Sequence, residues 1–578
     1  MRFNVWNSHV GSVHPDRFLG VDMKGKIKAS SANDFKGTTT TLHLAPEILS
    51  KVFYETLQPF DSVDHRVNPA NNALQLLDLT HVSSYFRQVA VSDGSLWAEV
   101  LYLNGVHADF FVAILERSRG YFISLCFMED SSLLFDPCVW TRLLLNFNKV
   151  RRLQIGVGDS SGGATLKFIL SFEAPFLEDL TIQWCGDRNA CLDYFEGRIL
   201  RQPFMNGAPR LRKLHLINCF FPSKHYSAFP NLANLSVMYI GDDDNHDHPP
   251  LISILDLSEG LGRFNSLTTL TLSTGCIDPG DFESDIQQAP VHFPRLLRFN
   301  FMTTTAACRQ LASILRLPAG CSRNIHLSFP PPPHPGVGVL DATSAAEAAA
   351  LFVPSDVEFK RCVVGMADDD EPFLRLIALG PSTPRIAVEM SFKLSDVAIH
   401  SLHPQNQLPT IHYFPGISTR TFTVTDIFLH QLCTTLSIIL RKRLSVVSTL
   451  YVWFGCESPA VFIAVSLLRS MTNIHEIVSH ASDLWANPSI QEFLSWDNAP
   501  SLRTLIIPID ETVQSARVLA GISAILRSRS DIGGVIFRVR SATIAEMGYA
   551  APDELRSLIR GISEGFPDTV SLDWVEYQ

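Results

Sequence analysis

The chain has 578 residues, of which 46% are apolar and 18% are charged, and its formal net charge is −11. A chain this apolar is not intrinsically disordered, and it is long enough for several domains or for one extended array of repeats. The negative charge argues against a nucleic-acid-binding protein, which needs a basic face.

The 11 cysteines are scattered, and no Cys-x-x-Cys pair occurs. With an odd number of cysteines and no signal-peptide-like apolar run near residue 1, we expect reduced, buried thiols in the cytoplasm or nucleus. The most apolar windows, 436–440 and 460–468, are too short to cross a bilayer. We therefore expect no membrane partner.

Residues 1–41 show no periodicity and are predicted to be a loosely ordered arm. Residues 42–104 are different, because apolar residues recur there at three- and four-residue steps, which predicts two or three short amphipathic helices. Pro46 suits a first helical turn, the run 59–72 is predicted to be a loop, and Trp97 closes the segment. On periodicity alone, these helices would cap a larger domain.

The first half of this segment contains Leu44, Pro46, Ile48, Leu49, Val52 and Phe53, and the second half contains Leu79, Val82, Arg87, Leu96 and Trp97. This order of residues resembles the F-box, the helical module that binds a Skp-type adaptor in cullin–RING ubiquitin ligases. The chain departs from the family pattern at Ala45, where many members have a proline, and its loop at 59–73 is longer than in the shortest members. The resemblance implies that the adaptor is bound by Leu44, Pro46, Ile48, Leu49, Val52, Phe53, Leu79, Val82, Arg87, Leu96 and Trp97.

A second pattern recurs behind the helices, at 174–185, 208–219, 229–240, 293–303 and 499–510. Each copy has Ala or Phe, then Pro, one free position, an apolar residue, two free positions, an apolar residue, one free position and an apolar residue. The proline disfavours a continuing helix, and the last two apolar residues would share one face of a short strand. Looser copies occur at 147–158, 264–275 and 447–456.

This template resembles the leucine-rich repeat, with Leu211, Leu214 and Leu216 as its apolar positions. Cys185 and Cys219 stand where that family places a residue that bonds the turn. We therefore expect an α/β repeat fold: a small all-α F-box-like helical module, followed over 105–578 by an irregular leucine-rich-repeat-like solenoid.

The template fades between 304 and 440, where an insertion or a break between two repeat blocks is equally consistent with the sequence. Four consecutive prolines at 330–333 predict a loop, and the alanine-rich run 342–352 predicts a helix. Strands are predicted at 122–127, 385–392 and 420–427, and a last helix, turn and closing strand at 555–575.

No group of residues has the spacing of a catalytic or metal site. The Asp- and His-rich run 241–250 and the acidic run 366–372 are predicted to be solvated loops. Ser160 lacks the Gly-x-Ser-x-Gly frame of a nucleophile, and 336–339 lacks the lysine of a phosphate-binding loop. We expect no enzyme activity, no cofactor and no metal.

Together the two resemblances imply a non-catalytic, substrate-recruiting subunit of a Skp–cullin–F-box type E3 ubiquitin ligase. Its helical module would bind the Skp-type adaptor, and through it a cullin scaffold, while the repeats would bind a client protein. The alternative is a repeat-based interaction scaffold whose N-terminal helices only cap the solenoid. The exposure of Leu44, Ile48 and Val52 distinguishes the two hypotheses, because docking requires these side chains to face solvent.

Overall fold

The structure is a computed structural model in which the chain forms two compact units. Unit 1 comprises residues 1–180 and 204–208, and unit 2 comprises 181–203 and 209–578, whereas the predicted boundary was at residue 104. The structure describes residues 44–57, 69–99, 101–102, 107–118, 120–127, 137–158, 166–185, 203–204, 207–239, 252–273, 277–278, 290–329, 342–354, 357–366, 372–378, 386–394, 424–453, 467–479, 482–487, 490–491, 494, 499–509, 516–529, 532, 534–539 and 570–573.

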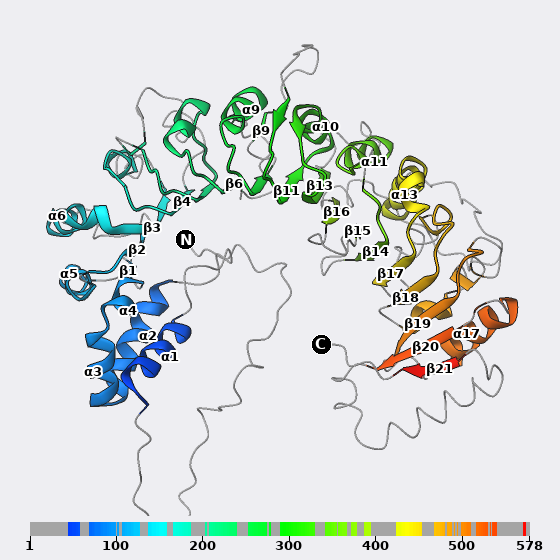
Figure 1. The fold of residues 1–578 in the computed structure, drawn as a ribbon, viewed down its shortest axis with the longest axis horizontal. Coiled ribbons are helices and arrows are strands. Elements are labelled where there is room, and N and C mark those ends of the chain that lie inside the picture. Colours follow the sequence, from blue (N-terminus) through cyan, green and yellow to red (C-terminus); the bar gives the residue numbers. More distant parts are fainter. Residues whose placement is uncertain are drawn as a thin grey trace, which may run out of the picture. The chain divides into compact units, whose positions relative to one another are not determined.

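Unit 1 begins with helices and continues into a parallel sheet (Figure 1). Its elements are α1 (Pro46–Thr56), α2 (Pro69–Val82), α3 (Ser84–Ser92), α4 (Gly94–Ala98), β1 (Leu101–Tyr102), α5 (Ala108–Arg117), β2 (Ile123–Phe127), α6 (Pro137–Asn146), η3 (Phe147–Lys149) and β3 (Val150–Val157). β1 pairs with β2, and β2 pairs with β3. The four N-terminal helices therefore lead directly into the sheet.

Unit 2 holds most of the strands. Its strands are the larger part of β4 (Asp179–Trp184), β5 (Lys213–Ile217), β6 (Asn234–Met238), β7 (Ile252–Ser253), β8 (Thr269–Ser273), β9 (Ile277–Asp278), β10 (Val291–His292), β11 (Arg298–Thr303), β12 (Leu315–Arg316), β13 (Ser322–Phe329), β14 (Arg361–Met366), β15 (Pro372–Ala378), β16 (Ile386–Leu394), β17 (Thr449–Trp453), β18 (Glu476–Ser479), β19 (Thr504–Ile509), β20 (Gly534–Val539) and β21 (Val570–Asp573). Its helices are η4 (Ser223–Ala228), α9 (Ile254–Leu261), α10 (Thr305–Ile314), α11 (Ala342–Ala350), α13 (Val424–Ile439), α14 (Arg441–Leu444), η6 (Ser482–Ala486) and α17 (Ala516–Ser528).

The main sheet of unit 2 is mostly parallel and departs from chain order at one place. Its strands pair in the order β5, β6, β8, β11, β13, β16, β15, β14, β17, β18, β19, β20 and β21. β15 pairs antiparallel with both β14 and β16, and all other neighbours in this order are parallel. In Figure 1, α9, α10, α11, α13 and α17 all lie along the same side of these strands.

Many neighbouring parallel strands start from turns that are hydrogen-bonded to each other. The Arg212 carbonyl accepts hydrogen bonds from the Ala233 and Asn234 amides, at 2.9 and 2.8 Å. The Ala233 carbonyl accepts in the same way from Thr268 and Thr269, at 2.7 and 3.0 Å. The pattern returns further along the sheet at the carbonyls of Lys360, Ser448 and His475. We call this side of the sheet, where the strands begin, the start edge.

Within a strand, successive side chains point to opposite faces of the sheet. The face toward the helices is apolar and fully buried on β5, β6, β8 and β11, through Leu214, Leu216, Leu235, Val237, Leu270, Leu272, Phe299 and Phe301. Complete burial of one such side chain stabilises the fold by roughly 1.5–3 kcal/mol. The other face carries mainly polar residues that are partly exposed, and we call it the open face. The recurring template is therefore explained by burial of one face.

The expected fold class is wrong. In place of a small all-α module followed by a leucine-rich-repeat-like solenoid, the described residues form a large, mostly parallel sheet with helices. The template reports only a strand with one buried face, which any such sheet produces. It carries no information on strand order, and so it missed the reversed order β16, β15, β14. The helices of unit 1 are also not separate, since β1 follows α4 directly.

Single elements are confirmed or corrected as follows. Every copy of the template contains a strand, the predicted strands at 122–127 and 385–392 are β2 and β16, and the alanine-rich helix is α11. The predicted strand at 420–427 is wrong, because α13 begins at Val424. Its β-branched residues favour a strand locally, but Leu432, Leu436 and Leu440 continue the run with helical spacing and are buried.

Several predicted segments lie outside the described residues. They are 1–41, most of the loop 59–72, Ser160, 241–250, 330–339, 367–371 and the last predicted helix. Of the predicted closing elements, the strand is present as β21. Among the residues that the structure describes, no helix has the length and apolarity needed to cross a membrane.

The packing of α17 onto η6 gives a test of the fold. A Cβ on Gly521 would lie 2.0 Å from the Trp485 carbonyl oxygen, so the helix has no room for a side chain there. We expect Gly521→Ala to lower the free energy of unfolding by about 1–3 kcal/mol, since overpacking of this kind forces the backbone to move. Urea denaturation followed by circular dichroism measures the change.

The matched control is Gly320→Ala, because a Cβ at Gly320 meets no heavy atom within 4 Å. This variant should stay close to the wild type or be slightly more stable, since alanine restricts the unfolded chain. Equal destabilisation by both substitutions would contradict the described packing of α17.

Candidate protein-docking surface

The helices α1 to α4 pack around a small apolar core. Phe53 of α1 contacts Phe86 of α3, with ring centroids 5.3 Å apart. Leu96 and Trp97 of α4 are completely buried, and the Trp97 indole Nε1 donates a hydrogen bond of 2.7 Å to the Ala90 carbonyl. This interior decides which apolar residues of the module remain available at its surface.

Four residues that the F-box resemblance assigns to the adaptor lie inside this core. Leu49, Phe53, Leu96 and Trp97 are each at most 2% exposed. In the free chain they hold the helices together, and a partner protein cannot reach them without unfolding the module. Leu79 is partly buried, and Arg87 is exposed, with its Nε donating to the Thr80 carbonyl at 3.0 Å.

The other predicted apolar contacts form an exposed surface. Leu44, Ile48 and Val52 are 46%, 54% and 46% exposed, and Val82 at the end of α2 is 63% exposed. Ile48 and Val52 are one helical turn apart, and Pro46 is exposed beside them. We call Leu44, Pro46, Ile48, Val52 and Val82 the apolar surface of the module.

One hydrogen bond places the start of α1 near the junction of α2 and α3. The Tyr85 hydroxyl donates to the carbonyl of Leu44, and Tyr85 is three residues beyond Val82. Leu44 thus lies at the end of α1 that faces this junction. Exposed apolar side chains that are grouped in this way often mark a surface that binds another protein.

The opposite end of the module is closed by α5. The Trp97 ring meets Phe110 edge-on at 6.5 Å between centroids, and the Arg117 guanidinium lies 4.5 Å from the Trp97 centroid. A Cβ on Gly94 would lie 2.6 Å from the Arg117 carbonyl oxygen, which explains the glycine at the start of α4. The module therefore packs against α5 through α4, while the apolar side chains of α1 remain exposed to solvent.

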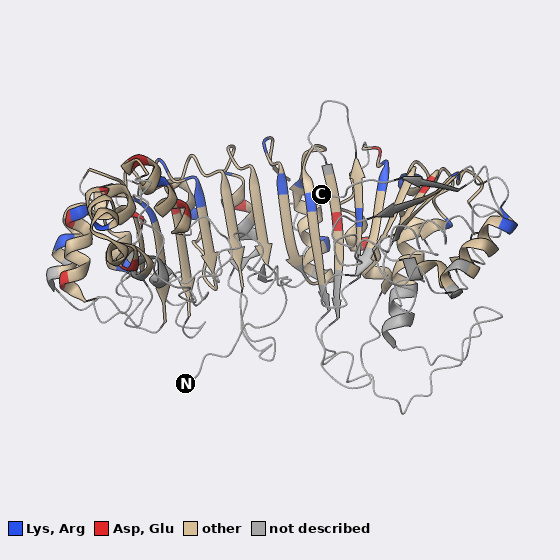
Figure 2. Cartoon of the chain, turned by 90° about the horizontal axis from the view of Figure 1, so that it is seen from below, with Lys and Arg blue, Asp and Glu red and all other residues tan. Residues whose placement is uncertain are grey.

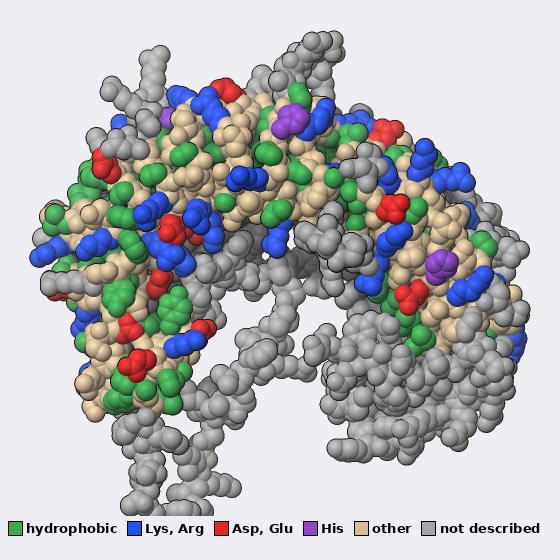
Figure 3. Space-filling model, viewed as in Figure 1, with side chains coloured by type: hydrophobic (Ala, Val, Ile, Leu, Met, Phe, Trp, Pro, Cys, Tyr) green, Lys and Arg blue, Asp and Glu red, His purple; other side chains and the backbone are tan. Residues whose placement is uncertain are grey.

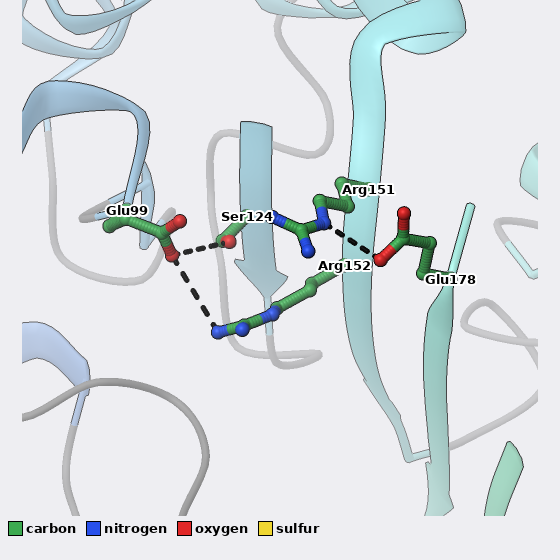
Figure 4. Close-up of polar contacts among 5 residues, drawn as sticks. All are labelled: Glu99, Ser124, Arg151, Arg152 and Glu178. Carbon is green, nitrogen blue, oxygen red and sulfur yellow. Dashed lines mark hydrogen bonds and ion pairs between the residues drawn. The ribbon is translucent and has the colours of Figure 1, made fainter. Parts of the chain in front are cut away.

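A charged cluster attaches α4 to the first strands of unit 1 (Figure 4). Glu99, which caps α4, accepts a 2.7 Å hydrogen bond from the Ser124 hydroxyl on β2 and lies 3.8 Å from the Arg152 guanidinium on β3. Beside it, the Nε of Arg151 donates to Glu178 at 2.9 Å. Ser124 is buried, and the side chains of Glu99 and Arg152 are only about one-fifth exposed. These contacts fix the module on the sheet of unit 1.

Asp93 is the polar centre of the helical module. It ends α3, caps α4 through the Ser95 amide at 2.9 Å, and accepts a hydrogen bond from the Ser50 hydroxyl of α1. Burial raises the pKa of this carboxyl, but hydrogen bonds from Ser50, Ser95 and the Leu96 amide outweigh burial and hold the pKa below its usual value of 3.8. The ionised form of Asp93 therefore stabilises the folded module.

Metal-binding clusters and reactive thiols are two other types of site to consider among the described residues. No group of three or more metal-binding side chains occurs among them. Burial raises the thiol pKa of Cys321 to about 11 and that of Cys308 to about 12, so neither thiol is a nucleophile at neutral pH. Cys219 donates to the Ile182 carbonyl at 3.5 Å, and Cys185 is exposed.

Two parts of this site were not identified from the sequence. Asp93 was not singled out from the sequence, although aspartate is one of the residues preferred at the N-cap of a helix. Glu99 and Arg152 are 53 positions apart, and nothing in the sequence pairs them. The apolar residues were found, but periodicity did not separate those that are exposed from those that are buried.

The chain matches no protein-family model, and it matches no curated protein. Sequence similarity therefore assigns no family. The function has to follow from the apolar surface of the module and from the residue pattern that resembles the F-box.

The low pKa of Asp93 makes the stability of unit 1 depend on pH in a defined direction. The folded-state pKa lies below that of the unfolded chain, about 3.9, so its contribution is complete above that pH and is lost as the pH falls through the folded-state pKa. We expect Asp93→Asn to lower the free energy of unfolding by about 1 kcal/mol at neutral pH. Below about pH 4, this difference from the wild type should shrink.

Urea denaturation of both proteins between pH 7 and pH 3 measures the difference in their free energies of unfolding. The contributions of the other carboxyl groups are common to both proteins and cancel in this difference. Ser50→Ala serves as the reference background, because it removes one of the donors to Asp93. In that background the pH dependence of the difference should be smaller. A difference that stays constant with pH would show that the charge of Asp93 does not stabilise the module.

Proposed function

We propose that this chain is a non-catalytic, substrate-recruiting subunit of a Skp–cullin–F-box type ubiquitin ligase. The observation that carries the proposal is the exposure of Leu44, Ile48, Val52 and Val82. These are apolar positions that the F-box resemblance assigns to the adaptor, and a folded module would normally bury such side chains. Their exposure is what the docking hypothesis requires and what a pure capping role does not need.

The mode of contact follows from the geometry of α1. An amphipathic helix that presents one apolar face can lie in a groove of a partner protein. Ile48 and Val52 would be the anchors on that face, with Leu44 and Val82 at its end. Leu49, Phe53, Leu96 and Trp97 support these anchors from the core and make no contact with the partner. The adaptor would connect the chain to a cullin scaffold, and the open face of the sheet would bind the client.

A second function, an interaction scaffold whose helices only cap the sheet, has one observation in its favour. Trp97, Phe110 and Arg117 pack α4 against α5, and Glu99 bonds to Ser124 of β2. These contacts explain the position of α4 but not the exposed apolar face of α1. Binding of an adaptor distinguishes the two functions.

The test uses the full chain and a purified Skp-type adaptor in isothermal titration calorimetry. Ile48→Asp places a charge on the apolar surface and should weaken binding about 30-fold or more, because loss of a central anchor costs about 2 kcal/mol. Circular dichroism should show that the variant stays folded, since Ile48 is 54% exposed. Trp97 is unsuitable as a probe, because its replacement would disrupt the core.

The control is Leu145→Asp, at an apolar residue of α6 that is 69% exposed and lies outside the module. This variant should bind the adaptor as tightly as the wild type. Absence of binding by the folded wild type, or equal binding by the Ile48→Asp variant, would contradict the proposal and favour the scaffold.

A further inference from the structure

The start edge of unit 2 carries a strong local charge bias over β5, β6, β8 and β11. The four strands and the turns that lead into them span 208–217, 229–238, 264–273 and 293–303, and these segments contain no Asp or Glu. They contain Arg210, Arg212, Lys213, Arg295 and Arg298. In a chain with a net charge of −11, this is a marked reversal of sign.

The register of the sheet places two uncharged residues, Asn234 and Thr269, between these cations, and we call these two residues the floor. Lys213 pairs with Asn234, Asn234 with Thr269, and Thr269 with Arg298. The four residues therefore form one row across the strands, with a cation at each end. Since neighbouring strands are about 4.8 Å apart, Lys213 and Arg298 begin about 14 Å from each other. Arg212 extends the first end of the row.

The row faces solvent. Arg212 and Arg298 are exposed, Lys213, Asn234 and Thr269 are partly exposed, and the next residue along each strand is buried. Within the described part of the chain, Arg212, Arg295 and Arg298 make no ion pair, so their charges are available to a partner. Figure 2 shows Lys and Arg toward one end of the strands of unit 2. Figure 3, which is viewed along the strands, shows Lys and Arg side chains in blue on the surface facing the viewer.

The floor between the cations can hydrogen-bond a peptide. Beside the row, the Thr268 hydroxyl donates to the Asn234 Oδ1 at 3.2 Å. Two residues further along the strands, the Asn300 amide donates to the Thr271 hydroxyl at 3.1 Å. Amide and hydroxyl groups of this kind both donate and accept, and so match the alternating N–H and C=O groups of an extended backbone. An extended chain advances about 3.4 Å per residue, so four residues cover the distance between the two cationic ends.

We infer that this surface, defined by Arg212, Lys213, Asn234, Thr269 and Arg298, binds an extended acidic segment of the client protein. The segment crosses β5, β6, β8 and β11, with negative side chains at positions i and i+4. One meets Arg212, and the other meets Arg298. The inference rests on the proposed function, because it supplies the class of client that the subunit recruits. Carboxylate and phosphoserine both provide the required charge.

The experiment measures fluorescence anisotropy of labelled peptides with the full chain, without adaptor, so its outcome is independent of adaptor binding. The first peptide carries Asp at i and i+4 in a Ser/Gly/Asn background, the second carries phosphoserine at the same positions, and the third carries Asn there. We expect both charged peptides to bind, at least 10-fold more tightly than the neutral one, with affinity falling as salt increases. The tighter of the two identifies the source of the charge.

The variant is the double substitution Arg212→Glu, Arg298→Glu, and it should reduce binding of the charged peptides at least 10-fold. The control is Arg441→Glu, Lys442→Glu, which reverses two exposed charges on α14, ahead of β17 and several strands away in the sheet. It should leave binding unchanged. Both variants are surface substitutions, and circular dichroism verifies their folding.

Three results would overturn the inference. They are equal binding of the neutral peptide, equal loss of binding in both double variants, and no detectable binding of either charged peptide by the folded wild type. Tighter binding of a single-stranded DNA of the same length would also reject it, since the surface would then be a general polyanion site. Loss of adaptor binding in the earlier experiment would leave these results unaffected.

Discussion

The structure depends on the hydrogen-bonded turns at the start edge of the sheet. In each of the paired turns, one carbonyl accepts the amides of two consecutive residues of the next turn, as Arg212 does from Ala233 and Asn234. This fixes the register of the strands before the ladder begins. A shift of one residue would exchange the buried leucines for the polar residues of the open face, which would be very unfavourable. The same constraint therefore builds the core and aligns the side chains of the open face in rows.

Much of the sheet could be predicted from the sequence, because its signal is local. The proline ends the preceding segment, Leu211 or Leu296 packs in the turn, and the next two apolar residues enter the core. The order of the strands is not local. β14, β15 and β16 are joined in chain order but enter the sheet reversed, so that β13 pairs with β16 and β14 with β17. Only contacts between distant residues decide this, and the fold class inferred from the template was wrong for that reason.

The candidate site shows the same division between local and tertiary information. Ile48 and Leu49 are adjacent, equally apolar and on the same predicted helix face, yet one is 54% exposed and the other 2%. The difference comes from α3 and α4, which fill the space beside Leu49 and Phe53 and leave Ile48 and Val52 uncovered. The sequence identifies the apolar residues, but the packing of neighbouring helices decides which of them are buried.

The two proposed surfaces differ in the physical basis of their specificity. On the module, apolar area would provide most of the affinity for the proposed adaptor, and the shape of the adaptor's groove would determine the specificity. On the open face of unit 2, cations about 14 Å apart are separated by more than the screening length of about 8 Å at physiological ionic strength. Each cation therefore interacts almost independently with a partner, and a partner whose negative charge is spread out gains little binding free energy. Under the proposed mode of binding, a client would need both negative groups at the right separation, while the net charge of −11 would repel acidic proteins elsewhere on the surface. A basic surface on an acidic chain can in this way select by spacing and not by net charge.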